Sequence, residues 1–263
     1  SDPNPLIAGK GIKLLRSKGI EVTENVLKDE CDRLNEVFLH YIRTELPFVV
    51  MKYAMTMDGK IACYTGASKW ITGSSAREHV HRQRHRFSGI MVGAGTVLAD
   101  DPQLTCRIDG LQNPVRIICD TNLRIPPEAQ VVATAGEVPT IIATCCEDAD
   151  RCEIYVKKGC RILHTDKKNG HVDLKQLMEK LGKLQIDSIL LEGGGTLNWA
   201  ALQSGIVKKV QAYVAPKILG GKTALTPVEG KGVADPADSF ILENSSFEKL
   251  GEDLLIESEV IYD

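Results

Sequence analysis

Short apolar runs alternate along most of the chain with segments whose apolar residues recur at helical spacing. The runs are bounded by Pro, Gly or Asp, as buried strands commonly are: FVVMKYAM (48–55), SGIMVG (88–93), PVRIICD (114–120) and SILLE (188–192). Between them lie SAREHVHRQRHRF (75–87) and DLKQLMEKL (173–181), which are typical of helices. Strands that alternate with helices predict an α/β fold with a mostly parallel central sheet flanked by helices.

The two ends of the chain depart from this alternation. Towards the C-terminus, two alternating runs joined around Gly251 predict an antiparallel hairpin that closes the sheet. Residues 1–46 form a separate piece that begins with a loop, and the boundary is marked by Pro47. A segment of that length rarely buries enough apolar surface to fold alone, so it must pack on the main domain, residues 47–263, or on a partner. Its expected elements are a helix over 11–18, a strand over 20–23 and helical spacing from 26 to 42.

The stretch ILLEGGGTLNWAAL (189–202) combines a strand, a glycine turn and a helix that begins near Thr196. That arrangement brings backbone N–H groups and a helix dipole up to a phosphate. Glycine lets the chain turn sharply while a ligand lies against it. The strand ends at Glu192, so an acidic group is expected in the same cleft. A glycine-rich turn of this kind can also be only a tight connection, so the pattern alone leaves both interpretations open.

Composition and charge exclude several classes of function. The chain has 263 residues, a 43% hydrophobic fraction and a net charge of −3, so nothing draws it as a whole to nucleic acid or anionic membranes. No apolar run approaches the ~20 residues that span a bilayer. The N-terminus lacks the basic start and apolar core of a signal peptide. The eight cysteines form no C-x-x-C pair, so we expect free thiols in a reducing cytoplasm.

Charged residues in apolar surroundings are candidates for chemistry. Lys52 lies within the strand 48–55, where its ammonium either reaches a cleft or belongs to an edge strand. Asp100 and Asp101 are adjacent, so their side chains point to different sides and do not form a paired acid and base. Asp101 precedes a proline and is expected to shape a turn or a cap, which makes Asp100 the cleft candidate.

The helix 75–87 carries four arginines and three histidines. Ser75 and Glu78 fit a capping box at its start. His81 and His85 have a spacing that can chelate a metal, but no H-E-x-x-H pattern or third ligand accompanies them, so no metal is expected. A nucleic-acid surface is disfavoured by the acidic net charge and the scarcity of stacking aromatics. We therefore expect a solvated face, with one or two arginines turned inward to a ligand phosphate.

Several phrases of the sequence coincide with those of one family. Over residues 47–263 the chain closely resembles the reductase domain of the bacterial bifunctional riboflavin-biosynthesis deaminase/reductase, which implies a dihydrofolate-reductase-like fold. Residues 1–46 resemble the C-terminal end of the deaminase domain of the same family. The phrases are KYAMTMDGKIA (52–62), SKWITG (68–73), VGAGTVLADDPQLTCR (92–107), LLEGGGTLNWAAL (190–202) and VAPKILGG (214–221).

The deaminase chemistry of that family is not expected from this chain. It requires a zinc-bound water held in H-x-E and P-C-x-x-C context, and neither H-x-E nor a P-C dipeptide occurs in the sequence. The chain is either a fragment without the N-terminal domain or a reductase that retains a vestige of it. For the reductase, the resemblance implies NADPH-dependent reduction of the ribosyl group of 5-amino-6-(5-phosphoribosylamino)uracil to the ribityl group, in a cytoplasmic homodimer.

The resemblance also implies roles for individual residues. Lys52 and Asp100 are the candidates for moving protons during opening of the ribose ring. Arginine suits the substrate phosphate, and the Glu192 carboxylate can accept hydrogen bonds from the pyrimidine. The positions that match substrate contacts are Ser68, Arg84, Leu104, Arg107 and Glu192. The positions that match cofactor contacts are Ala54, Trp70, Thr72, Thr96, Asp100, Thr121, Gly193, Gly194, Gly195 and Thr196.

Other functions stay open at this point. A reductase of a pterin or another pyrimidine on the same fold would have little use for two inward arginines, Arg84 and Arg107. A non-catalytic nucleotide-binding protein would keep the glycine turn but tolerate loss of Lys52 and Asp100, which are both present. The sequence assigns no cation to the 2′-phosphate that distinguishes NADPH from NADH, and Arg124 is only a guess.

Overall fold

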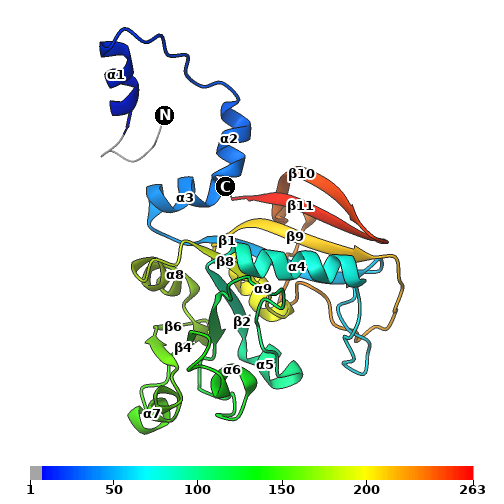
Figure 1. The fold of residues 1–263 in the computed structure, drawn as a ribbon. Helices are drawn as coiled ribbons and strands as arrows, with labels where there is room; N and C mark the ends of the chain where they lie inside the picture. The colour runs from blue at the N-terminus through cyan, green and yellow to red at the C-terminus, as the bar shows by residue number, and fades with distance from the viewer. Residues whose placement is uncertain (1–7, 263) are drawn as a thin grey trace.

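A single large sheet organises the protein (Figure 1). The structure, a computed structural model, describes residues 8–262. Over these residues the strand order is β10-β11-β9-β1-β8-β2-β3-β4-β5, parallel from β9 to β5, with β11 antiparallel to both of its neighbours. The strands are β1 (Phe48–Thr56), β2 (Gly89–Gly93), β3 (Val115–Cys119), β4 (Thr140–Thr144), β5 (Arg161–His164), β8 (Ser188–Leu191), β9 (Val207–Ala215), β10 (Ile241–Leu250) and β11 (Asp253–Ile261). A separate short pair is formed by β6 (Lys167–Lys168) and β7 (His171–Val172).

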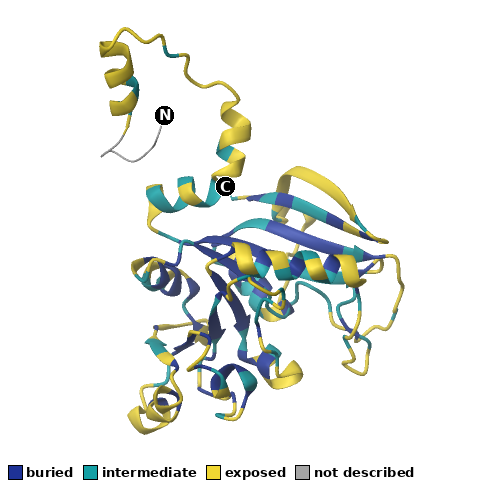
Figure 2. Cartoon of the chain, viewed as in Figure 1, coloured by how far each residue is buried: buried dark blue, intermediate teal, exposed yellow. Residues whose placement is uncertain are grey.

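Helices cover both faces of the parallel part of the sheet. One face packs its apolar side chains against α8 and α9, and the other packs against α4, α5, α6 and α7. Figure 2 shows the central strands buried between these helices. The helices of the main domain are α4 (Ser74–Arg86), α5 (Ala94–Asp100), α6 (Gln130–Ala133), α7 (Ala149–Lys157), α8 (Leu174–Lys183) and α9 (Gly195–Gln203), with a 3₁₀ turn η1 (Pro236–Asp238). The predicted fold class, including the C-terminal hairpin β10–β11, is confirmed.

The order of the strands creates a natural ligand site. The chain passes from β1 to β2 across the gap that β8 later fills, continues outward through β3 to β5, and then returns. Ligands of open α/β sheets bind beyond the carboxyl ends of the strands where the strand order reverses. In this sheet that region lies at the ends of β1, β8 and β2.

The first helix of the main domain begins differently from the prediction. The residue before α4 is Gly73, and Ser75 lies inside the helix without a capping hydrogen bond, so the predicted capping box is wrong. Instead the Gly73 N–H donates to the carboxylate of Asp253 at 2.7 Å. Asp253 is buried at the start of β11. A carboxylate distant in sequence therefore takes the place of a local cap, which no local pattern could predict.

The N-terminal segment meets the main domain through one helix, α3 (Glu36–Thr44). The Tyr41 hydroxyl donates to the carbonyl of Gly182 at 2.9 Å, and Lys209 forms an ion pair with Glu36. The preceding α1 (Lys10–Ser17) and α2 (Lys28–Leu34) bury no residue and lie away from the sheet in Figure 1.

Two expectations for the N-terminal segment are corrected. The segment 20–23 is not a strand: it is largely exposed, and no strand within residues 8–262 pairs with it. The helical spacing from 26 to 42 is divided into α2 and α3 at Asn35. The loop predicted at the start of the chain lies largely in residues 1–7, outside the described residues. No helix over 8–262 combines the length and hydropathy needed to cross a membrane.

Candidate active site

A cavity of about 1120 Å³ opens at the carboxyl ends of β1, β8, β2 and β3. This volume exceeds the ~300–1,000 Å³ of a site for one drug-sized ligand, so two ligands can share it. Every site residue predicted from the sequence lines the cavity except Leu104: Lys52, Ala54, Ser68, Trp70, Thr72, Arg84, Thr96, Asp100, Arg107, Thr121, Glu192, Gly193, Gly194, Gly195 and Thr196. The tertiary structure thus brings together six segments of the sequence.

Leu104 lies elsewhere. Its side chain is 3% exposed and belongs to the apolar cluster beneath the sheet that includes Ile118 and Leu123. Its φ is +54°, so the backbone turns here in the left-handed region. The side chain supports the segment between Asp100 and Arg107 from below and does not face the cavity.

A buried ion network occupies the floor of the cavity. Glu192 follows β8 directly and accepts two hydrogen bonds from Arg84, Nε to Oε1 at 2.8 Å and Nη2 to Oε2 at 3.0 Å. The ammonium of Lys52 lies 3.5 Å from the same Oε2. The side chains of Lys52, Arg84 and Glu192 are 14%, 13% and 11% exposed. Lys52 from β1 and Arg84 from α4 therefore share the carboxylate of Glu192, which follows β8.

The charges of this network shift its protonation equilibria. Burial by itself would raise the pKa of Glu192, but the positive charges of Arg84 and Lys52 and their hydrogen bonds outweigh burial and lower the pKa to about 2. Burial lowers the pKa of Lys52, an effect that the Glu192 carboxylate opposes and the Arg84 charge adds to. The lysine is thus a more acidic ammonium than one in water, held in contact with a permanent carboxylate.

The geometry revises the expectation for the arginines. The Arg84 guanidinium is committed to Glu192, and its Nη1 donates to the carbonyl of Thr105 at 3.1 Å. Arg84 therefore positions the acid and the segment 104–107. Arg107 is exposed at the rim of the cavity. Its side chain makes no hydrogen bond or ion pair with any residue in the described range and remains the arginine available to a phosphate.

The two histidines that have chelating spacing hold a loop instead. His81 Nδ1 accepts a hydrogen bond from the N–H of Arg107 at 3.3 Å, and His85 Nδ1 accepts one from Gln112 at 3.1 Å. Both nitrogens face the loop that follows Thr105. Among residues 8–262, no group of three or more His, Cys, Asp or Glu side chains is arranged to hold a metal ion.

A second set of residues beside Lys52 escaped the sequence reasoning. The ring of Tyr213, from β9, is completely buried, and its centroid lies 5.6 Å from the Lys52 ammonium. The Tyr213 hydroxyl is 2.8 Å from His79 Nδ1, and His79 Nε2 is 3.2 Å from Gln83 Nε2. Burial raises the pKa of Tyr213. The only local signal was the four-residue spacing of His79 and Gln83, which places both on one side of the helix.

Two cations hold the loop that carries Trp70 and Thr72. Lys217 Nζ donates to the carbonyls of Trp70 at 3.0 Å and Ile71 at 2.7 Å. Arg77 Nη1 donates to the carbonyl of Thr72 at 2.7 Å, and its guanidinium lies 4.6 Å from the centroid of the Trp70 ring. Three consecutive carbonyls are thereby fixed from outside the loop, which places the side chains of the loop at the cavity.

The three glycines after Glu192 are required for reasons other than a left-handed turn. Gly194 has φ −73° and ψ 169°, a conformation open to any residue. A Cβ on Gly195 would lie 2.4 Å from Cγ of Glu229, and one on Gly193 would lie 3.0 Å from Oδ1 of Asn198. A Cβ on Gly194 would meet only Oγ1 of Thr96, at 3.9 Å, and would otherwise face open space. Packing thus excludes side chains at Gly193 and Gly195, while Gly194 leaves room on the cavity side at the start of α9.

The two aspartates differ in their contacts, although both line the cavity. Asp101 ends α5 with φ +39°, and its Oδ1 accepts the N–H of Gln130 at 2.8 Å, which is a structural role. Asp100 is exposed and lines the cavity. Within the described chain, no hydrogen bond or ion pair joins Asp100 to Lys52, so the structure does not link the two predicted catalytic residues directly.

Comparison with known proteins gives a consistent picture. A family model described as the RibD C-terminal domain matches residues 47–256. The riboflavin biosynthesis protein RibD of Actinobacillus pleuropneumoniae is 52% identical over 261 residues, which are 99% of this chain and 69% of that protein. A 2,5-diamino-6-ribosylamino-4(3H)-pyrimidinone 5′-phosphate reductase of Methanothermobacter thermautotrophicus is 40% identical over 80% of this chain and 97% of its own length. The solved structure of Acinetobacter baumannii RibD superposes with a TM-score of 0.83 at 31% identity, over 99% of this chain and 71% of that one.

Proposed function

The chain belongs to the family of the RibD C-terminal domain and is a reductase of riboflavin biosynthesis, and on this premise we propose that it reduces the ribosyl group of 5-amino-6-(5-phosphoribosylamino)uracil to the ribityl group with NADPH. One observation carries the proposal. A single cavity has a glycine turn at a helix start on one part of its wall and a buried network of Lys52, Glu192 and Arg84 on another. The first suits a dinucleotide, and the second suits a polar substrate.

The residues present fit a nicotinamide dinucleotide. Gly194 leaves the wall open where a Cβ would otherwise project, and the start of α9 favours an anion through its unpaired N–H groups and dipole. Gly193, Gly195, Thr196 and Thr96 surround the same point of the cavity. When bound, the cofactor supplies the hydride that reduces C1′ of the sugar. The residues that would contact its remaining parts are Ala54, Trp70, Thr72, Asp100 and Thr121.

The side chains of the floor can move and hold a proton. Opening of the ribose ring breaks the bond between C1′ and the ring oxygen, and that oxygen must gain a proton. We assign the donor role to the Lys52 ammonium, whose acidity is increased by burial. Glu192, 3.5 Å away, keeps the ammonium oriented, and Arg84 keeps Glu192 charged and in place. Asp100 at the rim is the second candidate for proton transfer.

The substrate phosphate is assigned to the exposed side of the cavity. Arg107 has a free guanidinium there, and Ser68 lines the same cavity. Guanidinium binds phosphate through two parallel charge-assisted hydrogen bonds. A pterin lacks a group of this kind, so the position of Arg107 favours a phosphorylated pyrimidine over the alternative of a pterin reductase.

Anaerobic oxidation of NADPH tests the proposal. The wild-type chain should oxidise NADPH in the presence of 5-amino-6-(5-phosphoribosylamino)uracil and not with dihydrofolate. 2,5-Diamino-6-ribosylamino-4(3H)-pyrimidinone 5′-phosphate should be run alongside, because a relative 40% identical is named for it. Turnover of only that compound would move the reaction to the step before deamination. Binding of NADPH without turnover of either pyrimidine would instead support a non-catalytic nucleotide-binding protein.

The organisation of the whole protein is also a proposal. We assign residues 1–46 to the end of a deaminase domain and 47–263 to the reductase. The assignment is supported by the RibD relative from A. pleuropneumoniae, whose alignment covers 99% of this chain but 69% of the relative. We also propose a cytoplasmic homodimer. The dimer is supported by the exposed apolar side chains of the edge strand β10, among them Ile241 and Phe247 at 53% and 67% exposure. Light scattering on the purified chain, with Phe247→Lys as the variant, tests the dimer.

A further inference from the structure

An aromatic ring lies beside the Lys52 ammonium. The ring belongs to Tyr213 of β9, and its centroid is 5.6 Å from Lys52 Nζ. Lys52 pairs across the sheet with Gln211, two residues before Tyr213, so the side chains of Lys52 and Tyr213 lie on the same face of the sheet. The charged groups that act on the ammonium are Glu192, which follows β8, and Arg84 of α4. The proposed reduction uses both of these groups but leaves Tyr213 without a role.

Tyr213 is sealed from the cavity. Its side chain is completely buried, and it is not among the residues that line the cavity wall. The ring packs in a small apolar cluster with Ala76 and Val80 of α4 and Leu255 of β11. Tyr213 therefore cannot contact a ligand in the cavity, and any influence that it has on the reaction must pass through Lys52.

The hydroxyl end of the ring is held by α4. The Tyr213 hydroxyl is 2.8 Å from His79 Nδ1, and His79 Nε2 is 3.2 Å from the amide nitrogen of Gln83, whose side chain is also buried. Burial raises the pKa of Tyr213, so its hydroxyl stays uncharged. A buried tyrosine that is hydrogen-bonded at its hydroxyl and packed along its ring keeps one orientation.

One helix thus holds both neighbours of the lysine, since Arg84 donates to Glu192 and His79 contacts Tyr213. The face of an aromatic ring attracts an ammonium that lies within ~6 Å of its centroid, and it favours the charged form of that ammonium. Resting on the function proposed above, we propose that Tyr213 is a positioning residue for the reduction: its ring holds the Lys52 ammonium beside Glu192 in the charged form that delivers the proton.

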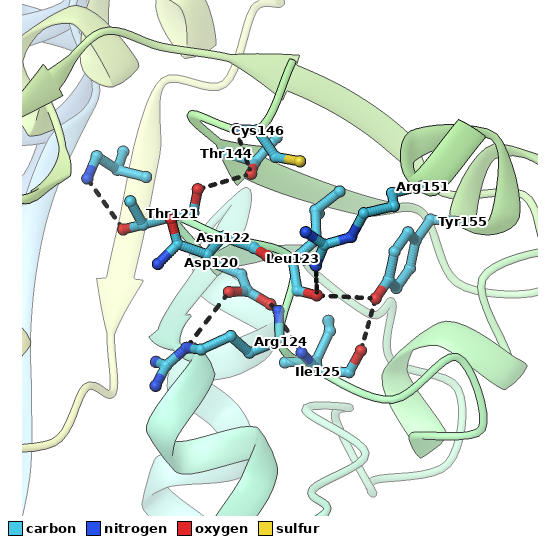
Figure 3. Close-up of polar contacts among 11 residues, drawn as sticks. Asp120, Thr121, Asn122, Leu123, Arg124, Ile125, Thr144, Cys146, Arg151 and Tyr155 are labelled. Carbon is cyan, nitrogen blue, oxygen red and sulfur yellow. Dashed lines mark hydrogen bonds and ion pairs between the residues drawn. The ribbon is translucent and has the colours of Figure 1, made fainter. Parts of the chain in front are cut away.

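A second buried tyrosine offers a matched control. The Tyr155 hydroxyl, from α7, donates to the carbonyl of Ile125 at 2.6 Å, in the loop that follows β3 (Figure 3). That loop is wound around Asp120, which is buried beneath Arg124 and accepts the backbone N–H groups of Arg124 and Ile125. Within residues 8–262, no ammonium lies over the Tyr155 ring, and the ring belongs to a different apolar cluster from that of Tyr213.

Fluorination of the ring tests the proposal while keeping the shape of the side chain. Tyr213→Phe is prepared with zero to three fluorine atoms on the ring, because each fluorine withdraws negative charge from the ring face. The unfluorinated variant keeps the ring and should retain the wild-type dependence of kcat on pH. In the active chain, kcat should fall at alkaline pH as Lys52 loses its proton. Fluorination should move that fall to lower pH by about one pH unit in total, so that kcat on the falling limb drops about 10-fold.

The other kinetic constants separate positioning from a general disturbance of the site. KM for the pyrimidine and the Kd for NADPH should stay constant through the series, because the ring does not line the cavity. The same replacements at Tyr155 should leave the alkaline limit of kcat unchanged. If unfluorinated Tyr213→Phe loses as much activity as the trifluorinated variant, the hydroxyl rather than the ring face is responsible, and the proposal is overturned.

Titration of Lys52 itself gives a readout that does not need turnover. The lysines are reductively methylated with isotope-labelled formaldehyde and followed by NMR, and the Lys52 signal is the one missing from Lys52→Met. Its midpoint should move to lower pH with each fluorine at position 213 and stay in place for the Tyr155 series. A midpoint that stays in place in the first series, or moves equally in both, overturns the proposal. If the proposed function fails instead, the pyrimidine is not reduced, while the Lys52 midpoint still moves with fluorination.

Discussion

The guanidinium of Arg84 meets the carboxylate of Glu192 edge to edge, with Nε to Oε1 at 2.8 Å and Nη2 to Oε2 at 3.0 Å. The pair joins the last turn of α4 to the residue that follows β8, across 108 residues of sequence. It leaves Oε2 in contact with Lys52, at 3.5 Å. A two-point contact of this kind fixes direction as well as distance, so Arg84 orients the carboxylate towards Lys52.

Glu192→Gln should separate charge from shape in this network. The amide has the size of the carboxylate but cannot neutralise Lys52 and Arg84, so both cations become uncompensated in a buried site. We expect at least ~10-fold lower turnover of the phosphoribosylamino-pyrimidine, because charge-assisted bonds of this kind are worth ~1.5–3 kcal/mol. The affinity for NADPH should stay near the wild-type value. Unchanged turnover in steady-state assays would contradict the role of Glu192.

The same variant predicts a pH dependence of stability. The pKa of Glu192 is lowered from 4.5 to about 2 in the folded chain, so its charged form stabilises the fold above about pH 4.5. That contribution is lost as the pH falls towards 2. Urea unfolding of both proteins at several pH values should show the wild-type advantage over Glu192→Gln shrinking across this window. A constant difference in the free energy of unfolding would show that the carboxylate is not the group responsible.

Lys52→Met should abolish proton delivery while sparing the fold. The methionine keeps the length of the apolar stem, and Glu192 retains both hydrogen bonds from Arg84. General acid catalysis contributes ~10²–10⁴ in rate, and kcat should fall by that order. Lys249→Met, an exposed position on β10, is the matched control and should have wild-type kinetics. If Lys52→Met changes KM alone, the ammonium binds the substrate but does not transfer a proton.

Arg107→Ala should raise KM for the phosphorylated substrate about 10- to 100-fold, as expected for loss of a charge-assisted contact. Its side chain is exposed and makes no hydrogen bond or ion pair with residues 8–262, so stability should be unaffected. The dephosphorylated pyrimidine nucleoside should show no such difference between wild type and variant. An equal rise in KM for both compounds would show that Arg107 does not bind the phosphate. Arg161→Ala, exposed on β5, serves as the control for surface charge.

Gly194→Val and Gly195→Ala should fail in different ways. A side chain at 194 meets only Thr96 Oγ1, at 3.9 Å, so the variant should unfold like wild type but lose NADPH in a fluorescence titration. A Cβ at 195 would lie 2.4 Å from Glu229 Cγ and 2.8 Å from the carbonyl of Thr226, and overpacking of this sort costs ~1–3 kcal/mol of stability. Gly136→Val, on the surface with no atom within 4 Å of its Cβ, is the control. If Gly194→Val keeps the wild-type affinity for NADPH, this turn does not bind the phosphates of the cofactor.

Much of the fold could be predicted because its signals are local. The buried strands are continuous apolar runs, and the helices between them have the expected composition, so Phe48–Thr56 and Ser188–Leu191 appear within one residue of the predicted bounds. The predictions failed where a segment depends on an interaction partner that is distant in sequence. At the start of α4 the Gly73 N–H donates to Asp253, and Ser75 makes no cap. The segment 20–23 has the composition of a strand, but no strand of the described part of the chain pairs with it.

The sequence by itself determined the class of sheet and the order of the motifs, and its resemblance to a known family named the expected site residues, all of which except Leu104 line one cavity. Only the tertiary structure decided what those residues do to one another. It turned Arg84 towards Glu192, placed the Tyr213 ring beside Lys52, sent Leu104 into the core and sealed Asp120 beneath Arg124. The reason is physical: periodicity along a chain reports which side of a strand or helix is buried, whereas ion pairs and hydrogen bonds depend on distances between elements that only packing sets.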